Sequence, residues 1–332
     1  MEILISGGAG FIGSTIASAS IDAGHIPVII DDMSTGAEAF VKDRIFYRGD
    51  VSDPEIMNKV FHEHPQIAAA VHCAASIVVP DSVADPLGYY RNNVSKTVEF
   101  VGHLNRLGCQ RILFSSSASI YAVGEDFTVD ESSSLDPQSP YARTKAMVEE
   151  ILADAAQAGL VSCLSLRYFN PVGADPKRRT GQQRTRPSHA LGKLLEAHNE
   201  HVPFTITGVD WPTRDGSAIR DYIHVWDLAL AHVRALERFD SIAEVEDGYA
   251  VINLGTGRGT TVRELVHIFE SANDVELEIS EGPPRPGDVV GSYTRVDKAE
   301  SLLAWTAQLS IADAVQDALA WSAIRDAVLR SA

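Results

Sequence analysis

A tyrosine and a lysine stand four positions apart in the stretch "SPYARTKAMVEE", residues 139–150, which has the pattern of a helix start. Residues i and i+4 of a helix share one face, about 5–6 Å apart. The phenol of Tyr141 would then lie beside the ammonium of Lys145, and a cation there is expected to lower the pKa of the phenol from its usual value near 10. Such a pair could move a proton, but an ordinary surface pair has the same spacing. The two residues alone do not decide between these interpretations.

A second stretch with chemical potential is "ILISGGAGFIGSTIA", which places Gly7, Gly10 and Gly13 between an apolar run and an amphipathic helix pattern. Small residues at such a turn let the backbone approach a diphosphate, which then lies at the N-terminus of the helix. Asp31 ends the next apolar run, 18 residues after Gly13, and can accept hydrogen bonds from ribose hydroxyls. No Lys or Arg follows Asp31 before residue 42, which favours NAD over NADP.

These residues need a scaffold, and the first half of the chain predicts one in which short apolar runs alternate with helical patterns. Strands are expected at 2–6, 26–31, 44–50, 68–75, 111–117 and 161–169, with helices near 11–23, 53–63, 85–107 and 140–157. Strands that are apolar throughout and separated by helices indicate a parallel sheet covered on both faces. The expected fold is α/β, a Rossmann-type parallel sheet with helices on both faces.

From about residue 171 the pattern changes, because Pro, Gly and charged residues become denser. Helices are expected near 187–199, 262–272 and 310–330. The segments 220–236 and 250–257 again look like a helix and a strand of the first half. We therefore expect an NAD-binding domain over 1–170, to which about 221–257 returns. A smaller, discontinuous α/β substrate lobe would comprise 171–220 and 258–332.

The composition limits the partners. The chain has 332 residues, 45 % of them hydrophobic, and a net charge of −17. So acidic a surface argues against nucleic acid or an anionic membrane as a partner, since both would repel it. The densest basic run, "KRRTGQQRTR" at 177–186, is either a solvated loop or a positive rim near a phosphate.

The cysteines and the N-terminal residues bear on the compartment. Cys73, Cys109 and Cys163 are odd in number and widely spaced, which is typical of a reducing compartment rather than a disulfide framework. No CxxC or HExxH motif suggests a metal site. The chain begins directly in an apolar run without a signal-type segment, and no stretch approaches the roughly 20 apolar residues of a membrane span. A cytoplasmic protein is expected.

Several further motifs follow in order along the chain, among them "GDVSD", "HCAAS", "YYRNNV", "FSSSASIYA", "LRYFNPVGA", "IRDYIHVWDLA", "INLGTG" and "RPGD". Together with the GxxGxxG turn and the YxxxK pair, this series resembles the extended short-chain dehydrogenase/reductase family, and within it the UDP-glucose 4-epimerases. The resemblance covers essentially the whole chain. It implies tightly bound NAD and the interconversion of UDP-glucose and UDP-galactose through a 4-keto sugar.

The resemblance also implies roles for individual residues. Tyr141 would take the proton from the sugar 4-hydroxyl, Ser117 would hydrogen-bond the same oxygen, and Lys145 would also hold the nicotinamide ribose. The cofactor would contact Gly7, Gly10, Phe11, Ile12, Gly13, Asp31, Asp32, Met33, Ser34, Asp50, Val51, Cys73, Ala74, Ala75, Ser76, Asn92 and Phe169, besides Tyr141 and Lys145. The UDP-sugar would contact Ser117, Asn170, His189, Ala190, Thr205, Arg220, Arg285, Asp288 and Ser292. A homodimer paired through the helices 85–107 and 140–157 is implied as well.

Some positions depart from the best-known pattern. Ile77 stands where some members carry a lysine, and His189 where many have an asparagine. Ser292 stands where relatives restricted to glucose and galactose carry a bulky tyrosine. A small residue there should admit an N-acetyl group, so UDP-GlcNAc and UDP-GalNAc are expected as further substrates, unless Tyr293 restores the bulk.

Other functions on the same fold are less well supported. Dehydratases and nucleotide-sugar decarboxylases place an acid just after the strand-end serine or threonine, whereas Ala118 and Ser119 follow here. A non-catalytic NAD-sensing regulator would often lack the tyrosine or the lysine. A UDP-pentose or UDP-uronate 4-epimerase remains the main alternative.

Overall fold

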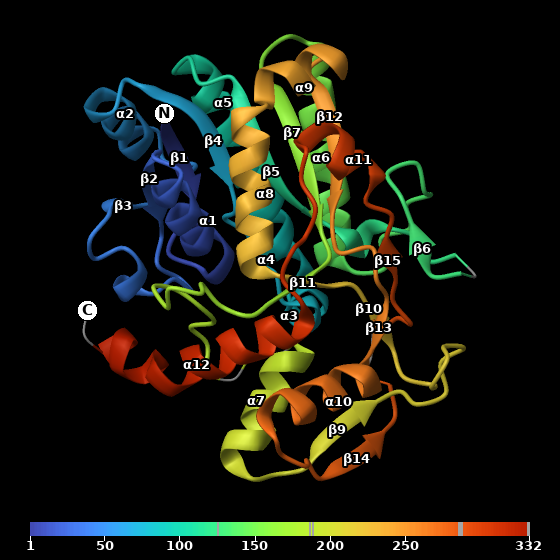
Figure 1. Ribbon diagram of the computed structural model, residues 1–332. Helices are drawn as coiled ribbons and strands as arrows, with labels where there is room; N and C mark the ends of the chain where they lie inside the picture. Colours follow the sequence, from blue (N-terminus) through green and yellow to red (C-terminus); the bar gives the residue numbers. More distant parts are fainter. Residues whose placement is uncertain (125, 186, 188, 285–287, 331–332) are drawn as a thin grey trace.

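The computed structural model spans residues 1–332 and describes all of them except 125, 186, 188, 285–287 and 331–332. A parallel sheet of seven strands dominates the described part of the chain, in the order β12-β7-β5-β4-β1-β2-β3 (Figure 1). Its strands are β1 (Glu2–Ser6), β2 (Ile26–Asp31), β3 (Ile45–Arg48), β4 (Ile67–His72), β5 (Arg111–Ser117), β7 (Ser162–Tyr168) and β12 (Tyr249–Leu254). The expected α/β fold class is confirmed.

Helices cover both faces of this sheet because its strands are apolar on both sides. In β1, Ile3 and Ile5 belong to one core cluster and Leu4 to the other, all three fully buried. The first cluster is closed by α1 (Phe11–Asp22), α8 (Val225–Glu237), α9 (Phe239–Val245) and α11 (Asp297–Leu303). The second is closed by α2 (Pro54–Glu63), α5 (Lys96–Arg106) and α6 (Pro140–Gln157).

The helical stretch expected near 85–107 is confirmed over 86–106, but it contains an irregularity. After α3 (Val79–Ala84) it runs as α4 (Pro86–Tyr90), a π-helical turn η2 (Arg91–Ser95) and α5. The turn is held by the side chain of Asn93, which accepts a hydrogen bond from the Ser76 amide at 2.8 Å and donates to Thr144 of α6 at 3.1 Å. One extra residue in a helical turn lets this side chain face the sheet.

A second group of elements lies below the sheet in Figure 1. It contains α7 (Ala190–Glu200), α10 (Val262–Asn273) and the paired strands β9 (Phe204–Thr207) and β14 (Ile279–Gly282). These helices share a third core cluster with α12 (Ile311–Arg330), which crosses between the two groups. A capping box of Thr261 and Glu264 starts α10.

Short strand pairs connect the two groups: β8 (Asn170–Val172) with β11 (Tyr222–His224), β10 (Ile219–Arg220) with β13 (Thr260–Thr261), and β6 (Thr128–Val129) with β15 (Tyr293–Thr294). The segment 220–236 was expected to be helical throughout, but its first residues belong to β10 and β11, with Asp221 between the two strands, and the helix begins at Val225. The chain then returns to the sheet through α8 and β12, which pairs with β7. The two-domain division itself stays a prediction.

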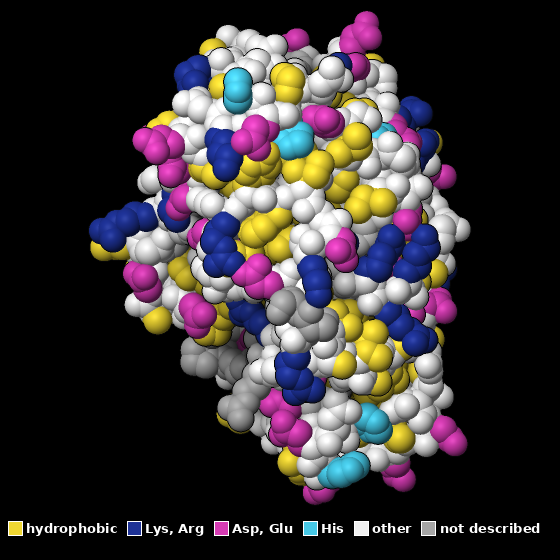
Figure 2. Space-filling model, turned by 90° about the vertical axis from the view of Figure 1, so that its left-hand side faces the viewer, with side chains coloured by type: hydrophobic (Ala, Val, Ile, Leu, Met, Phe, Trp, Pro, Cys, Tyr) yellow, Lys and Arg dark blue, Asp and Glu magenta, His cyan; other side chains and the backbone are white. Residues whose placement is uncertain are grey.

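The surface carries both signs of charge. On the face in Figure 2, Lys and Arg side chains lie among Asp and Glu side chains. Within the described residues, no helix is long and apolar enough to cross a membrane.

Candidate active site

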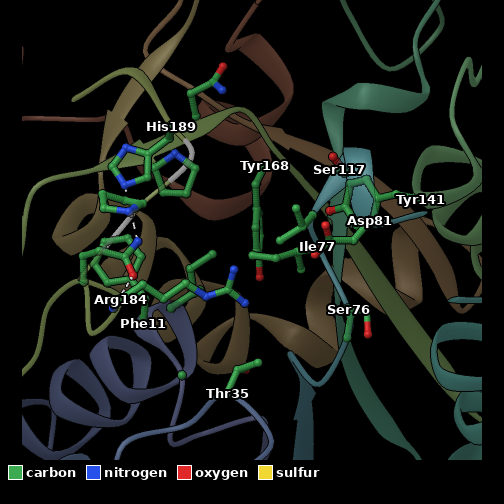
Figure 3. Close-up of a pocket in the computed structure, with 18 of the residues that line it drawn as sticks. Phe11, Thr35, Ser76, Ile77, Asp81, Ser117, Tyr141, Tyr168, Arg184 and His189 are labelled. Atoms are coloured by element: carbon green, nitrogen blue, oxygen red, sulfur yellow. Dashed lines mark hydrogen bonds between the residues drawn. The ribbon is translucent and has the colours of Figure 1, made fainter. Parts of the chain in front are cut away.

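A cavity of about 1180 Å³ opens at the carboxyl ends of the parallel strands. It lies where the strand order reverses, between β1 and β4, which is where open α/β sheets bind ligands. Figure 3 shows Ser117 and Tyr141 on one side of this cavity, Phe11, Arg184 and His189 on the other, and Tyr168 between them.

Most of the predicted site residues line this one cavity. From the cofactor set these are Gly7, Gly10, Phe11, Ile12, Gly13, Asp31, Asp32, Ser34, Asp50, Val51, Cys73, Ala74, Ala75, Ser76, Asn92, Tyr141 and Phe169. From the substrate set they are Ser117, Asn170, His189, Ala190, Thr205, Arg220 and Asp288. Met33, Lys145 and Ser292 are not among the lining residues, and Arg285 lies outside the described residues.

The glycine turn has the shape of a diphosphate cradle. A Cβ on Gly7, whose φ is +70°, would stand 2.7 Å from the Ala74 amide nitrogen, and one on Gly13 would overlap the Gly7 carbonyl. A Cβ on Gly10 would meet nothing closer than 3.4 Å, yet Gly10 lines the cavity. No side chain caps the N-terminus of α1, so its first N–H groups are available to an anion. This end of the cavity fits the diphosphate of NAD.

The acid at the end of β2 is held ready as an acceptor. The carboxylate of Asp31 accepts hydrogen bonds from the amides of Ala9 at 3.0 Å and Met33 at 2.8 Å. Burial raises its pKa, and these two amides counteract that effect. Met33 therefore contributes through its backbone by orienting Asp31. Two neighbouring acids, Asp31 and Asp32, on the cavity wall suit ribose hydroxyls and would repel a 2′-phosphate.

The far wall of this end is fixed by hydrogen bonds around β4. Asn92 donates to the Ser76 hydroxyl at 3.2 Å, beside the contacts of Asn93 described above. Burial raises the pKa of the Cys73 thiol to about 11, so this thiol stays neutral at physiological pH. Asp50 forms an ion pair with Lys96 at 2.6 Å. The sequence predicted a role for Asn92 but not for Asn93, because nothing in "YYRNNV" distinguishes the two neighbouring asparagines.

Ser117 and Tyr141 meet across the cavity because a strand end faces a helix start. Ser117 ends β5, and Tyr141 lies in the first turn of α6. This helix begins at Pro140, because the Ser139 hydroxyl caps it by accepting a hydrogen bond from the Ala142 amide at 3.1 Å and proline suits the first helical position. The nearby Ser117 hydroxyl lowers the pKa of Tyr141, while burial, the larger effect, raises it. The Ser117 hydroxyl itself lies 2.9 Å from that of Ser119.

Lys145 lies one turn after Tyr141 and is 4 % exposed. Its ammonium donates to the Ser115 carbonyl oxygen at 2.6 Å, and burial lowers its pKa to about 8. The expectation that Lys145 lowers the pKa of Tyr141 is wrong for this structure, because burial of the phenol dominates and the ammonium points to the backbone of β5.

A buried ion pair supports this face of α6 from behind. The carboxylate of Glu149, two turns after Tyr141, accepts hydrogen bonds from Arg167 at 2.6, 2.9 and 3.2 Å and from the Ser116 hydroxyl. Arg167 also donates to the Tyr121 hydroxyl at 2.7 Å, which in turn donates to Asn253 at 2.7 Å. This network ties β5, α6, β7 and β12 together directly behind Ser117.

The second group of elements supplies the other end of the cavity. The ring of His189 caps α7 by accepting from the Gly192 amide at 3.1 Å, and burial lowers its pKa to about 4, so the imidazole is neutral. Arg220 donates to the carbonyl oxygens of Val289 at 3.0 Å and Val290 at 2.7 Å. The described residues contain no cluster of His, Cys, Asp and Glu that could hold a metal ion.

Comparison with known proteins identifies relatives that match over nearly the whole chain. The family model "NAD dependent epimerase/dehydratase family" matches residues 3–255. A UDP-glucose 4-epimerase from Azospirillum brasilense is 37 % identical over 323 residues, which are 96 % of this chain and 91 % of that protein.

Solved structures agree with this relationship. The UDP-glucose-4-epimerase from Stenotrophomonas maltophila, with bound NAD and formylated UDP-arabinopyranose, superposes with a TM-score of 0.92 at 34 % identity, covering 100 % of both chains. The UDP-Glc/GlcNAc 4-epimerase from Campylobacter jejuni gives a TM-score of 0.81 at 32 % identity, covering 97 % of this chain and 99 % of the other. The chain therefore belongs to the NAD-dependent epimerase/dehydratase family and, within it, to the family of UDP-glucose 4-epimerases.

Proposed function

We propose that this protein is a UDP-hexose 4-epimerase that interconverts UDP-glucose and UDP-galactose through a 4-keto intermediate with tightly bound NAD. The observation that carries the proposal is the single cavity that contains the glycine turn, Ser117 with Tyr141, and residues of the second lobe. A ligand placed between the two lobes would present its sugar to Ser117 and Tyr141.

The residues of this chain supply proton transfer and orientation. NAD, when bound, provides the acceptor and donor of a hydride. Tyr141 takes the proton from the sugar 4-hydroxyl and later returns it, while Ser117 holds the same oxygen. The nearby Ser117 hydroxyl lowers the pKa of the phenol, whereas burial, the larger effect, raises it and keeps the phenol protonated. Lys145, one turn further along α6, donates to the Ser115 carbonyl oxygen and so fixes the end of β5 next to Tyr141.

The test is to incubate the purified protein with UDP-galactose without added NAD and to follow the sugar by NMR. Hydride returns to the sugar in each turnover, so UDP-glucose should form catalytically and the protein should contain NAD(H). Accumulation of free NADH with an oxidised sugar would instead identify a dehydrogenase. Bound NAD without turnover of any UDP-sugar would support the NAD-sensing regulator.

Two extensions of the substrate range are tested by the same assay with a panel of UDP-sugars. UDP-pentoses are the main alternative, which is favoured by the UDP-arabinopyranose derivative in the Stenotrophomonas relative. UDP-uronates belong to the same alternative. We also propose turnover of UDP-GlcNAc, because Ser292 is small and the Campylobacter relative is a UDP-Glc/GlcNAc 4-epimerase.

We further propose a homodimer formed through α4, α5 and α6. Leu87, Val98 and Met147 lie on these helices and are 65 %, 46 % and 41 % exposed. A four-helix bundle between two copies would bury them. Light scattering at micromolar concentration should give twice the chain mass, and a monomer would contradict this proposal.

We propose a cytoplasmic location because the three cysteine thiols are free. Cys73, Cys109 and Cys163 are all free, and the last two are buried. Free thiols suit a reducing compartment. Fractionation of cells that produce the protein would test this assignment.

A further inference from the structure

One segment of the second lobe crosses the cofactor-binding helix α1. It comprises residues 175–184 and is called the strap below. The Thr180 hydroxyl lies 3.1 Å from that of Thr15 in α1. Lys177 and Arg179 both form ion pairs of 2.9 Å with Asp22 at the end of α1. The basic run of the sequence is therefore docked on the helix whose N-terminus forms the diphosphate cradle.

The tip of the strap is fixed from two sides. The side-chain amide of Gln183 donates to the Thr35 carbonyl oxygen at 2.9 Å, in the loop that follows Asp31. The indole of Trp321 in α12 donates to the Gln182 carbonyl oxygen at 2.9 Å. Gly181 lies against the same indole, since a Cβ there would stand 2.6 Å from the ring. These contacts hold the tip at the edge of the cofactor end of the cavity.

Among the described residues, the side-chain oxygen of Gln183 has no hydrogen-bond donor and the guanidinium of Arg184 has no carboxylate partner. The Oε1 atom of Gln183 is buried and accepts no hydrogen bond from the described residues. Arg184 lines the cavity on the side of Phe11, and its guanidinium forms no ion pair within the described part of the chain (Figure 3). Burial raises the pKa of Tyr89, and the positive charge of Arg184 is among the effects that lower it.

Tyr89 belongs to the wall of the cavity that lies opposite Arg184. The Tyr89 hydroxyl donates to the Val78 carbonyl oxygen at 2.7 Å, so it lies against the wall that follows β4. That wall carries Ile77 and Val78 and no cation between residues 73 and 80. Arg184 and Ile77 both line the cavity, and Figure 3 shows them on opposite sides of it.

The other described cations of the cavity are already engaged. Lys96 pairs with Asp50 at 2.6 Å and Lys193 with Glu196 at 2.5 Å, while Arg220 donates to backbone carbonyls on the substrate side. A dinucleotide brings two phosphate charges into the cradle, where a guanidinium can bind oxygens in pairs.

We propose that Arg184 binds the diphosphate of NAD, and that Gln183 accepts a hydrogen bond from a hydroxyl of the same ligand, so that the strap clamps the cofactor from the second lobe. This inference rests on the proposed NAD-dependent function. Gln183 contacts the loop after Asp31, which would face the ribose of bound NAD, whereas Arg220 lies at the other end of the cavity, where it donates to Val289 and Val290. The cofactor rather than the UDP-sugar is therefore the ligand of Arg184.

The test compares Arg184→Gln and Arg184→Lys with the wild type. Two quantities are measured: the molar NAD content of the purified protein, and the rate at which bound NAD exchanges with an excess of isotopically labelled NAD. Loss of a charged hydrogen-bonding partner should accelerate exchange roughly 10- to 100-fold. The lysine variant should be intermediate. Arg258→Gln, an exposed residue outside the cavity, removes the same charge and should exchange like the wild type.

A third measurement separates the two sources of a diphosphate. The dissociation constant for UDP, determined by calorimetry on the NAD-loaded protein, should change less than about twofold in Arg184→Gln. Unchanged NAD exchange with weakened UDP binding would assign Arg184 to the substrate and overturn the proposal, as would no change in either quantity. Neither readout needs turnover, so a protein inactive on every UDP-hexose would refute the proposed function but leave this test intact.

Discussion

The buried pair of Glu149 and Arg167 leads to a prediction that links stability to the site. Their side chains are each 5 % exposed, and the carboxylate is the ion-pair partner of the guanidinium. In Glu149→Gln the carboxylate becomes a neutral amide, so Arg167 stays buried with only neutral acceptors, the amide oxygen and the Tyr121 hydroxyl. The positive charge is then left without compensation in the core.

The magnitude follows from general values. Removing one partner of a buried ion pair costs about 3–5 kcal/mol of unfolding free energy. Unfolding entropy scales to about 0.7 kcal/mol/K for a chain of this length, so the melting temperature should fall by about 4–7 °C. The double variant Glu149→Leu with Arg167→Met removes both charges and should be more stable than Glu149→Leu alone, because no buried charge remains unpaired.

The assay is thermal unfolding by circular dichroism with NAD and UDP at fixed, saturating concentrations, since bound ligands shift the melting temperature. Glu237→Gln is the matched control. It breaks the pair with Arg234, whose side chains are 36 % and 39 % exposed, and should cost less than about 1 kcal/mol. If Glu149→Gln melted within 1 °C of this control, or the two losses in the double variant simply added, the assignment of a structural role to the pair would be refuted.

Three further predictions concern the site and the pH response. Tyr141→Phe keeps the ring but removes the proton carrier, so kcat for UDP-galactose should fall at least ~10²-fold while UDP binding stays unchanged; near-normal turnover would contradict the role of Tyr141. Ser292→Tyr should suppress turnover of UDP-GlcNAc and spare UDP-galactose. If the wild type were inactive on millimolar UDP-GlcNAc, the proposal that the small Ser292 admits an N-acetyl group would be wrong. Burial lowers the pKa of His72 to about 3 and those of His189 and His232 to about 4. Below the usual histidine pKa near 6.5, the unfolded chain therefore binds more protons than the folded chain. For each of these histidines, the free energy of unfolding should fall by up to about 1.4 kcal/mol per pH unit between pH 6.5 and 5. Urea unfolding at pH 7 and 5.5 measures this loss, and equal stabilities would contradict it.

The parts of the site that follow from local pattern could be predicted from the sequence. The strand 111–117 contains the apolar run Ile112, Leu113 and Phe114 and ends at Ser117. The Ser-Pro start of α6 fixes where Tyr141 enters the helix. Parallel strands bring their carboxyl ends to one edge, so the glycine turn, Asp31 and Ser117 had to lie at the same edge.

The remaining features depend on contacts between distant residues. The π-helical turn adds one residue to a helical pattern, and the hydrogen bonds of Asn93 with the distant residues Ser76 and Thr144 help to stabilise that addition. The basic run was expected to be either solvated or part of a positive rim. Which of its members face the cavity depends on α1 and on Trp321, which lies 139 positions after Gln182. The raised pKa of Tyr141 likewise follows from burial, which spacing does not reveal.

The docking of the strap under α12 has a consequence for synthesis of the protein. A ribosome releases the N-terminal half first, and β1 to β5 with their helices can fold while later residues are still being made. Trp321, which holds the strap tip, is synthesised 139 positions after Gln182. The glycine turn can thus form early, whereas the strap tip is fixed only after Trp321 has left the ribosome. A nascent chain without Trp321 would expose a half-built nucleotide site.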